Sequence, residues 1–459
     1  MCGISGIIDI SKNIVDDLYK SLFYLQHRGQ QSSGFIFFST NTKKTFKSKK
    51  MGLINAHIEE LKNFHGNMGI SHVRYPTNGS NSRKEIQPFS ILKPYGISLV
   101  HNGNIINREE IITFLNDKKI YVNSTSDSEL ILNVFYYYIE KDFNILTNEK
   151  IMTSVKKIYE LFKGSFSVII MLNDYGLIGF RDKYGIRPLV YSKTNTSLSI
   201  ASETNAFYNH SHFEDIKNGE LIIAKFENCK IEISNHQLYY EKLTPCIFEY
   251  IYFANPESYI NNILVYSFRE KLGEKVVQLL DEETRNSIDV IVPIPMTSII
   301  SATSIAHILN KPLKHAVVKN RYTHRTFINE GDDILKNISK IKVIHTLIKN
   351  KTVLVVDDSI VRGNTCYHII NELRKGNPKR LLFVSCSPPI RHPNHYGISI
   401  PTYDELIAHN KEVDEIGKEL DIDNLYYLSL DCIKEVLNDL NSNVNEFEDS
   451  SFTGNYLYQ

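Results

Sequence analysis

The C-terminal half of the chain contains the stretch Val353-Leu354-Val355-Val356-Asp357-Asp358-Ser359-Ile360-Val361-Arg362-Gly363-Asn364-Thr365, which decides its fold. Its first four residues are apolar and mostly β-branched, so they predict a strand that is buried on both faces. Two carboxylates follow at the carboxyl end of that strand, where open α/β sheets bind their ligands. The Ser, Gly, Asn and Thr residues predict a turn that opens a helix, and its N–H groups with the Thr365 hydroxyl can hold a phosphate.

Asp357 and Asp358 are not suited to that phosphate, because like charges repel, and they suit sugar hydroxyls or Mg²⁺ instead. An Asp-Asp pair alone more often caps a helix. The complete string, however, resembles the phosphoribosyl-pyrophosphate (PRPP) motif of type I phosphoribosyltransferases. The resemblance implies that Asp357 and Asp358 lie on the ribose and metal side. It also implies that Ser359, Gly363 and Thr365 hold the 5-phosphate.

The sequence around this stretch alternates between helical and apolar-strand patterns. Helices are expected at 269–281, 301–309 and 365–374, and strands at 289–292, 352–356 and 380–384. Such alternation is typical of a parallel sheet covered on both faces, an α/β domain.

Two further segments match the same kind of transferase. Residues 291–298 form a strand that ends in a proline-containing loop, which resembles the pyrophosphate loop and places Ser298 near the metal. Residues 319–327 resemble the loop that closes over PRPP, where Lys319 and Arg321 would neutralise the pyrophosphate. A plain proline turn and a solvated basic loop are the alternatives.

The N-terminal half follows a different pattern. Apolar residues alternate with small or polar ones at 69–74, 96–100, 165–170 and 197–201, as in antiparallel strands with one covered face. Helical periodicity appears at 17–26, 126–140 and 151–162. We therefore expect an α+β domain in which antiparallel sheets pack between helix layers.

Cys2 follows the initiator methionine directly. If Met1 is removed, one residue carries both a thiol and a free α-amine. An α-amine has a reference pKa of about 7.7–8.0 and a thiol one of about 8.5, so the amine can accept the thiol proton near neutral pH. A cysteine also occurs at position 2 by chance, so this observation is weak on its own.

Four short motifs follow Cys2 in order along the chain. They are His27-Arg28-Gly29-Gln30, His72-Val73-Arg74-Tyr75-Pro76-Thr77, His101-Asn102-Gly103-Asn104 and Thr125-Ser126-Asp127-Ser128-Glu129. Taken singly, His-Asn-Gly also fits a hairpin turn and Ser-Asp-Ser a helix cap. Together they resemble the class II, N-terminal-nucleophile glutamine amidotransferases.

Glutamine chemistry explains why these residue types are needed. Arg74 can clamp the α-carboxylate in a bidentate fork, and Asp127 can bind the α-ammonium. When the Cys2 thiolate attacks the side-chain amide, the Asn102 amide and the Gly103 N–H can stabilise the oxyanion that develops. Ammonia then leaves, and water cleaves the remaining thioester.

The two halves together resemble the glutamine PRPP amidotransferases, essentially from end to end. The resemblance implies internal transfer of ammonia to C1 of PRPP, which gives 5-phosphoribosylamine, glutamate and pyrophosphate with Mg²⁺ as cofactor. It also implies a homo-oligomer, a tetramer in the family. The expected division is a glutaminase domain at 2–243, a joint at 244–266, a transferase domain at 267–430 and a tail at 431–459.

Some positions depart from the family pattern. Some family members bind an iron–sulfur cluster through four cysteines. At those four positions this chain has one cysteine, Cys246, and has Asn394, Glu448 and Ser451 at the others. We therefore expect no iron–sulfur cluster. Asn255, Met296 and the stretch 335–343 also differ, which leaves inhibition by purine nucleotides open.

Composition limits the remaining possibilities. The 459 residues include 52 basic and 52 acidic side chains, which argues against a nucleic-acid partner. No apolar run approaches the roughly 18 residues that span a membrane, and the six scattered cysteines favour a reducing, cytoplasmic location. Two other functions remain open: a different class II amidotransferase, and a PRPP-sensing regulator on the same fold.

Overall fold

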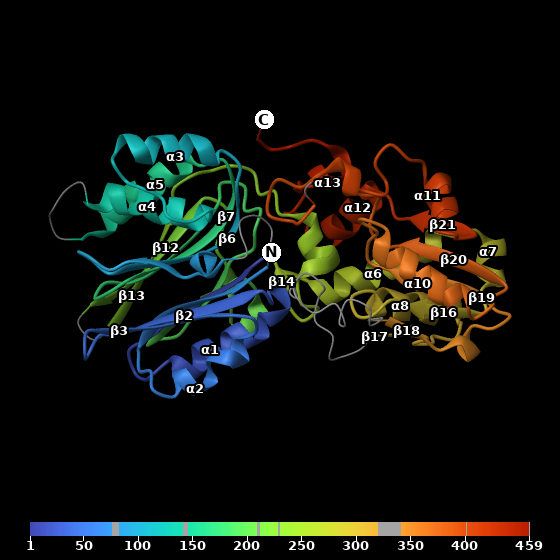
Figure 1. Ribbon diagram of the computed structural model, residues 1–459, viewed down its shortest axis with the longest axis horizontal. Helices are drawn as coiled ribbons and strands as arrows, with labels where there is room; N and C mark the ends of the chain where they lie inside the picture. The colour runs from blue at the N-terminus through green and yellow to red at the C-terminus, as the bar shows by residue number, and fades with distance from the viewer. Residues whose placement is uncertain are drawn as a thin grey trace.

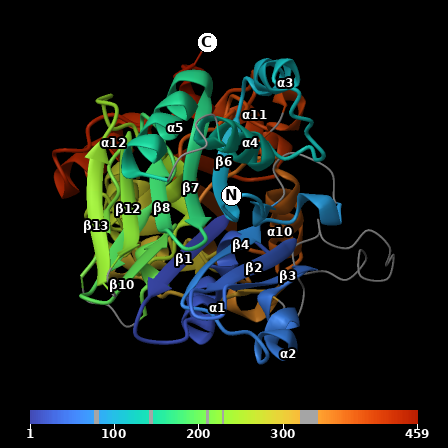
Figure 2. The same ribbon diagram turned by 90° about the vertical axis from the view of Figure 1, so that its left-hand side faces the viewer.

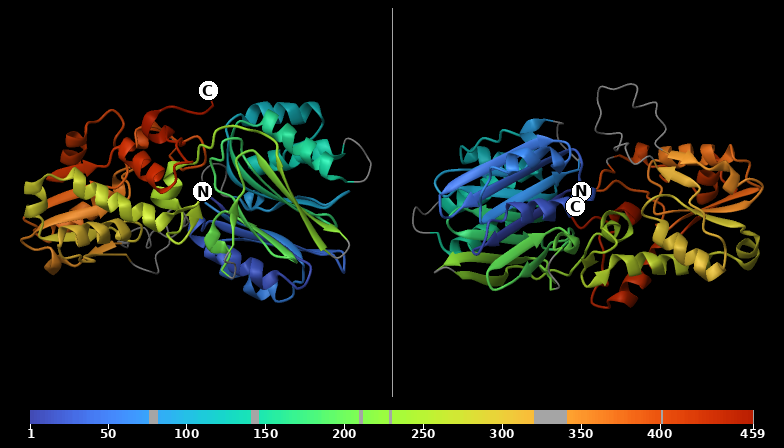
Figure 3. Two further views of the ribbon diagram at one scale, coloured as in Figure 1. Left: turned by 180° about the vertical axis from the view of Figure 1, so that it is seen from behind. Right: turned by 90° about the horizontal axis from the view of Figure 1, so that it is seen from below.

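The computed structural model describes residues 1–75, 82–140, 146–208, 212–227, 230–319, 341–400 and 402–458. Two lobes lie side by side, the first built from the N-terminal half and the second from the C-terminal half (Figure 1). The N-terminus lies at the junction between them in each view (Figure 3). The start of the chain therefore lies at the boundary between the lobes.

Two antiparallel sheets form the N-terminal lobe. The seven-stranded sheet has the order β11(Glu214–Asp215), β9(Val190–Lys193), β10(Ser197–Ala201), β1(Gly3–Asp9), β4(Met68–Arg74), β2(Ser32–Ser39) and β3(Lys44–Met51). The six-stranded sheet has the order β13(Lys230–Gln237), β12(Glu220–Glu227), β8(Gly176–Arg181), β7(Gly164–Leu172), β6(Ile97–Ile105) and β5(Phe89–Ile91). One core, which includes Ile4, Ile36, Val100 and Ile169, lies between the two sheets.

Helices cover the outer faces of both sheets (Figure 2). Helices α1(Val15–Tyr24) and α2(Ile58–Leu61) lie on the seven-stranded sheet, and α3(Arg108–Asp117), α4(Asp127–Glu140) and α5(Asn148–Leu161) lie on the other. This four-layer arrangement confirms the predicted antiparallel sheets between helix layers. The alternative that His101-Asn102-Gly103 is a hairpin turn is wrong, because all three residues lie within β6 and pair with β7.

A parallel four-stranded sheet forms the centre of the C-terminal lobe. Its order is β16(Val290–Pro293), β19(Thr352–Asp357), β20(Arg380–Ser385) and β21(Asn424–Tyr427). Helices α6(Val265–Leu279), α8(Ile299–Leu309) and α12(Leu430–Leu440) pack with Leu354 and Val356. Helices α10(Asn364–Arg374) and α11(Val413–Glu419) pack with Val353 and Val355 on the opposite face. The prediction of a parallel sheet buried on both faces is thus confirmed.

Shorter elements complete the fold. They are β14(Tyr259–Ile260), β15(Ile263–Leu264), α7(Glu282–Ser287), β17(Val317–Lys319), β18(Ile341–Val343), α13(Ser450–Thr453), the π-helix Glu249–Phe253, and 3-10 turns at Gln26–Arg28, Ile54–His57, Arg83–Glu85, Thr204–Ala206, His345–Leu347 and Tyr403–Glu405. The last residues fold back onto the joint, where the rings of Phe248 and Phe452 stack with centroids 5.1 Å apart. Within the described ranges, no helix is both long and apolar enough to cross a membrane.

Candidate active sites

Strand pairing places Cys2 next to the predicted glutamine-binding arginine. Gly3 of β1 lies opposite Val73 of β4, so Cys2 falls beside Arg74 at the ends of the two strands. The Cys2 thiol lies 3.9 Å from the carbonyl oxygen of Tyr75. Arg74 is largely buried, and a Cβ on Gly29 would come within 2.5 Å of its backbone. The His-Arg-Gly motif therefore contains glycine because the Arg74 backbone passes directly over it.

The second sheet supplies the predicted oxyanion donors. The backbone nitrogen of Cys2 donates to Asn102 Oδ1 at 3.0 Å. The Asn102 side-chain nitrogen is buried and has no hydrogen-bond partner among the described residues. Such a donor is costly to leave unpaired, so it is suited to receive a charge that develops beside Cys2. A Cβ on Gly103 would lie 2.0 Å from the carbonyl oxygen of Ser165, which explains the glycine there.

Asp127 is the first residue of α4 and lies beside strand β6 of the second sheet. Its Oδ2 accepts a hydrogen bond from the Ile105 N–H at 3.1 Å, and its Oδ1 lies 3.5 Å from His101 Nδ1. Burial pushes the pKa of Asp127 upward, but His101 and the Ile105 N–H outweigh burial and lower it. The carboxylate is therefore negative and able to bind an ammonium group.

Met1 occupies a buried position ahead of Cys2. Its side chain is 2% exposed, and its sulfur contacts the guanidinium of Arg187. Burial lowers the pKa of its α-amine to about 4. The amine that we expect to accept the thiol proton is the α-amine of Cys2. While Met1 is present, that nitrogen is part of the Met1–Cys2 peptide bond and is not a free amine.

A buried charge cluster surrounds the nucleophile, and no role was predicted for its members. Arg28 donates from Nε to the Cys2 carbonyl at 2.9 Å and from Nη2 to Glu249 at 2.9 Å. Glu203 forms an ion pair with Arg28 and accepts from the Asn255 N–H at 2.8 Å. Arg28 stands in one of the quoted motifs, but motif order does not reveal which charges pair in the fold.

The stretch 353–365 forms the strand, turn and helix start that the sequence predicts. Asp357 ends β19, and burial together with the charge of Asp358 raises its pKa well above the ordinary value. Asp358 accepts a hydrogen bond from the Ser359 hydroxyl at 2.8 Å. Gly363 has φ +77° and precedes α10, and a Cβ there would lie 2.5 Å from Ile407. Thr365 lies in the first turn of α10; its side chain is outside the described part.

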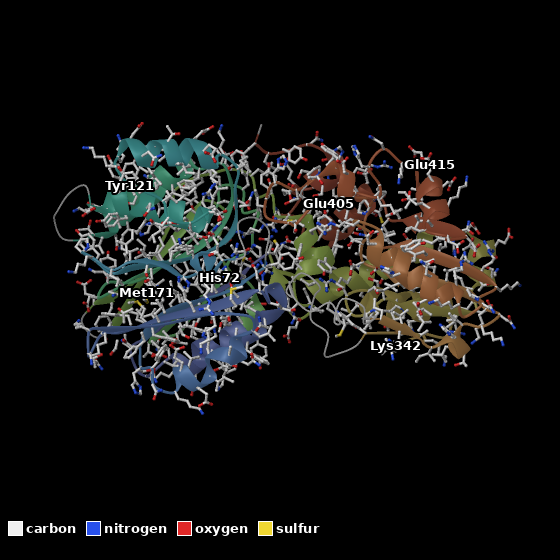
Figure 4. All side chains as sticks on the ribbon, in the orientation of Figure 1. His72, Tyr121, Met171, Lys342, Glu405 and Glu415 are labelled. Carbon is white, nitrogen blue, oxygen red and sulfur yellow. The ribbon has the colours of Figure 1, made fainter. Side chains whose placement is uncertain are left out.

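The other predicted transferase residues are only partly placed. Ser298 precedes α8 and is 1% exposed, and its hydroxyl donates to the Ile294 carbonyl at 2.6 Å. Lys319 ends β17 and is exposed, whereas Arg321 and the rest of the 320–340 segment lie outside the described residues. Arg362 forms an ion pair with Glu405. Figure 4 labels Glu405 in the C-terminal lobe and His72 in the N-terminal lobe.

The residues at the cluster positions contact one another. Cys246 and Glu448 form an isolated parallel bridge, and the Asn394 side-chain nitrogen lies 3.3 Å from both Glu448 Oε2 and the Ser451 hydroxyl. Burial raises the pKa of the Cys246 thiol to about 12 and that of Glu448 above its ordinary value. Among the described residues, no group of three or more His, Cys, Asp or Glu side chains converges as a metal site.

Comparison with known proteins agrees with this division into two sites. A model of the glutamine amidotransferase domain matches residues 72–209, and a model of the phosphoribosyl transferase domain matches residues 267–395. The chain is therefore an enzyme that joins a glutamine amidotransferase to a phosphoribosyltransferase.

Full-length relatives define the family. The amidophosphoribosyltransferases of Pasteurella multocida and Haemophilus influenzae are 38% and 39% identical over 100% of this chain and 93% of each relative. The glutamine PRPP amidotransferase of B. subtilis, solved in complex with ADP and GMP, has TM-score 0.86 and 29% identity over 99% of this chain and 97% of that chain. The chain belongs to the amidophosphoribosyltransferase family. This membership disfavours both a different class II amidotransferase and a PRPP-sensing regulator.

Proposed function

We propose that this enzyme makes 5-phosphoribosylamine from PRPP with ammonia taken from glutamine, the first committed step of purine biosynthesis. The observation that carries the proposal is the contact between Cys2 N and Asn102 Oδ1 at 3.0 Å, which places an amide whose NH₂ is buried and unpaired among the described residues next to the nucleophilic residue. The alignment of both halves with one family supports it.

The glutaminase half would act in three steps. Removal of Met1 frees the Cys2 amine, which accepts the thiol proton. The thiolate attacks the glutamine amide carbon while Arg74 and Asp127 hold the α-carboxylate and α-ammonium. The oxyanion that forms receives hydrogen bonds from Asn102 and Gly103. The C–N bond then breaks as the Cys2 amine returns its proton to the leaving ammonia. Finally, water cleaves the γ-glutamyl thioester to glutamate.

The transferase half would bind PRPP at the carboxyl edge of the parallel sheet. Asp357 and Asp358 are adjacent carboxylates, and burial together with the charge of Asp358 raises the pKa of Asp357. That donor set fits Mg²⁺, and the resemblance adds Ser298 as a further oxygen near it. When bound, Mg²⁺ supplies charge stabilisation to the departing pyrophosphate. Ser359, Gly363 and Thr365 would hold the 5-phosphate, and Lys319 and Arg321 would neutralise the pyrophosphate.

Other proposals rest on resemblance. Purine nucleotides are proposed as inhibitors, since the B. subtilis structure was solved with ADP and GMP. The resemblance to the family also leads us to propose that the enzyme is a homotetramer. A cytoplasmic location is proposed, which fits the free thiols at 2, 246, 366, 386 and 432. The absence of an iron–sulfur cluster is proposed because Asn394, Glu448 and Ser451 stand where clustered relatives have cysteines. The division into domains at 2–243, 244–266, 267–430 and 431–459 is likewise proposed.

The decisive experiment separates the two half-reactions. In Cys2→Ala, we expect glutamine-dependent pyrophosphate release to be abolished while release driven by added ammonia survives. Cys432→Ala, which changes a partly exposed cysteine on α12, is the matched control and should keep both activities. Equal loss of both activities in Cys2→Ala would contradict the two-site scheme.

A further inference from the structure

Three consecutive residues, Glu85, Ile86 and Gln87, contact both sheets of the N-terminal lobe and the loop that leads to Asp127; we call them the 85–87 segment. They lie between the 3-10 turn at Arg83–Glu85 and strand β5. All three are buried, none more than 6% exposed, and none has a role in the proposed chemistry. Buried polar side chains are normally hydrogen-bonded, so the partners of Glu85 and Gln87 show what the segment holds.

The Gln87 side chain continues a strand ladder that the backbone cannot continue. The register of β5 and β6 places Gln87 opposite His101, two residues beyond the last pair of the ladder. Pro88 lies between and has no N–H to donate. The Gln87 amide oxygen instead accepts from the His101 N–H at 2.7 Å, and its nitrogen donates to the His101 carbonyl at 3.2 Å. One side chain therefore holds both backbone groups of the residue that precedes Asn102.

The backbone of the 85–87 segment is fixed against the other sheet. A Cβ on Gly34 of β2 would lie 2.1 Å from the Gln87 carbonyl oxygen, so this close approach requires glycine. Lys49 lies opposite Gly34 on β3, and its Nζ donates to the Ile86 carbonyl at 2.5 Å. The segment thus packs on the seven-stranded sheet through its backbone and binds the six-stranded sheet through the Gln87 side chain.

Glu85 holds the loop that leads into α4. Its Oε1 accepts from the Thr125 N–H at 2.8 Å and from the Thr125 hydroxyl at 3.0 Å. Thr125 stands two residues before Asp127, the first residue of α4 and the proposed partner of the glutamine ammonium. Hydrogen bonds to a carboxylate are stronger than neutral ones, so Glu85 constrains the backbone that places Asp127.

We propose that the 85–87 segment sets the spacing between the two halves of the glutamine site. Gln87 is the positioning residue for the oxyanion donors Asn102 and Gly103. Glu85 is the positioning residue for Asp127. This inference rests on the proposed function and deepens it. Neither side chain has to touch the substrate, because each holds backbone close to the groups it places, and a misplacement of about 1 Å can lower a rate about 100-fold.

The same lobe supplies a matched control for each residue. Asn67 also binds at two points, accepting from the Thr40 N–H and donating to the Thr40 hydroxyl, each at 2.9 Å, but it precedes β4 at the end remote from the glutamine site. Glu220 is 7% exposed and accepts from the Lys217 N–H at 2.7 Å and the Asn235 side-chain nitrogen at 2.9 Å. Neither control binds β6 or the loop before α4.

The first measurement is kcat and glutamine KM for glutamate release at saturating PRPP. For Gln87→Met, which keeps the length of the side chain but cannot form these bonds, we expect kcat to fall by about 10- to 100-fold with KM unchanged. Asn67→Leu should keep the wild-type values. Equal losses in the two variants, or an effect of Gln87→Met confined to KM, would overturn the inference. Gln87→Asn, too short to reach both groups of His101, should repeat the kcat loss if Gln87→Met folds poorly.

The Glu85 variants separate positioning from direct binding of the substrate. In Glu85→Ala, we expect glutamine KM to rise by about tenfold, the effect of a weakened hydrogen bond to a charged group. Glu85→Gln should restore the wild-type KM, because its amide oxygen can accept both bonds from Thr125. Glu220→Ala should leave KM unchanged. If Glu85→Gln were as impaired as Glu85→Ala, the charge itself would bind the substrate and the inference would be wrong.

Alkylation of Cys2 by iodoacetamide shows whether the nucleophile is intact, because this reagent needs neither the oxyanion donors nor Asp127. The alkylation rate, followed by mass spectrometry of the N-terminal peptide, should match the wild type in Gln87→Met and Glu85→Ala. A fall as large as that in glutamine turnover would reveal general disruption and overturn the inference. Absence of glutamine-dependent pyrophosphate release in a wild type whose variants show the expected glutamate kinetics would contradict the proposed function alone.

Discussion

The side chain of Asn102 contacts the nucleophilic residue through its oxygen, which lies 3.0 Å from the backbone nitrogen of Cys2. This single contact fixes the rotamer of the amide, because an amide that uses its oxygen on one partner must turn its NH₂ elsewhere. That NH₂ is buried and unpaired among the described residues. The same side chain thus positions the Cys2 amine and keeps a donor ready for the oxyanion.

Replacement of Asn102 by Asp should separate these two roles. Asp retains an oxygen for the Cys2 N–H but replaces the donor by a negatively charged oxygen. We expect glutamine-dependent kcat to fall by about 10²–10³-fold, the usual effect of losing one oxyanion donor. Ammonia-dependent pyrophosphate release should stay at the wild-type level. Steady-state assays with each nitrogen source check this, and a comparable loss with ammonia would contradict the assignment.

Replacement of Arg74 by Gln should weaken glutamine binding. Arg74 lies at the end of β4 beside Cys2, and hydrogen bonds to a charged group contribute about 1.5–3 kcal/mol. We therefore expect kcat/KM for glutamine to fall by about 10- to 150-fold, mainly through KM. Gly29→Ala, which would place a Cβ 2.5 Å from the Arg74 backbone, should shift KM in the same direction. An unchanged KM in both variants would exclude Arg74 as the carboxylate clamp.

Local sequence patterns predicted the sheets well, because buried strands have a recognisable pattern of apolar residues. The apolar run 353–356 has no polar face, and its side chains indeed alternate between two cores. Helix ends were harder to predict. Helix α6 was expected from residue 269 but begins at Val265. Its start was missed because the residue before it, Leu264, has no capping side chain that would mark a helix start in the sequence. His101-Asn102-Gly103 continues as strand because β7, which lies some 60 residues further along, pairs with it.

Partners that are distant in sequence account for what the motifs did not reveal. Arg28 and Glu249 are 221 positions apart, and Ser165 and Tyr396 are 231 apart. Each residue is unremarkable in its own neighbourhood, and its role depends on a contact that only the assembled lobes create. Cys2, Asn102 and Asp357 could be proposed from the sequence because their expected chemistry is confined to short, ordered motifs.

The buried pair Arg28–Glu249 should be important for stability. Both side chains are essentially unexposed, and Glu249→Gln would leave the Arg28 and Arg187 charges less compensated. We expect a loss of about 3–5 kcal/mol in the free energy of unfolding, measured by urea denaturation. The exposed pair Lys157–Glu160 is the control, and Glu160→Gln should cost less than about 1 kcal/mol. Similar losses in the two variants would show that the buried cluster is not structurally important.

His57 should make stability depend on pH. It is buried between the hydroxyls of Ser33 and Ser48, and burial, assisted by the charge of Lys50, lowers its pKa to about 4. Because the unfolded chain binds this proton near pH ~6.5, the folded state loses stability as pH falls from about 6.5 toward 4, by up to ~1.4 kcal/mol per pH unit. The difference in unfolding free energy between wild type and His57→Gln should therefore shrink on acidification. If the unfolding free energies of the wild type and His57→Gln changed in parallel between pH 7.5 and 4.5, this prediction would be wrong.

Removal of the metal, or of Asp357, should abolish the transferase reaction alone. Several kcal/mol of leaving-group stabilisation correspond to at least about a 100-fold loss of rate. We therefore expect chelation by EDTA, and Asp357→Asn, to suppress pyrophosphate release from both glutamine and ammonia while glutamate release without PRPP persists. Asp423→Asn is the control: Asp423 binds the Leu381 N–H at the opposite, amino-terminal edge of the same sheet, so pyrophosphate release should survive. If Asp357→Asn retained ammonia-dependent turnover, the carboxyl edge of β19 would not be the PRPP site.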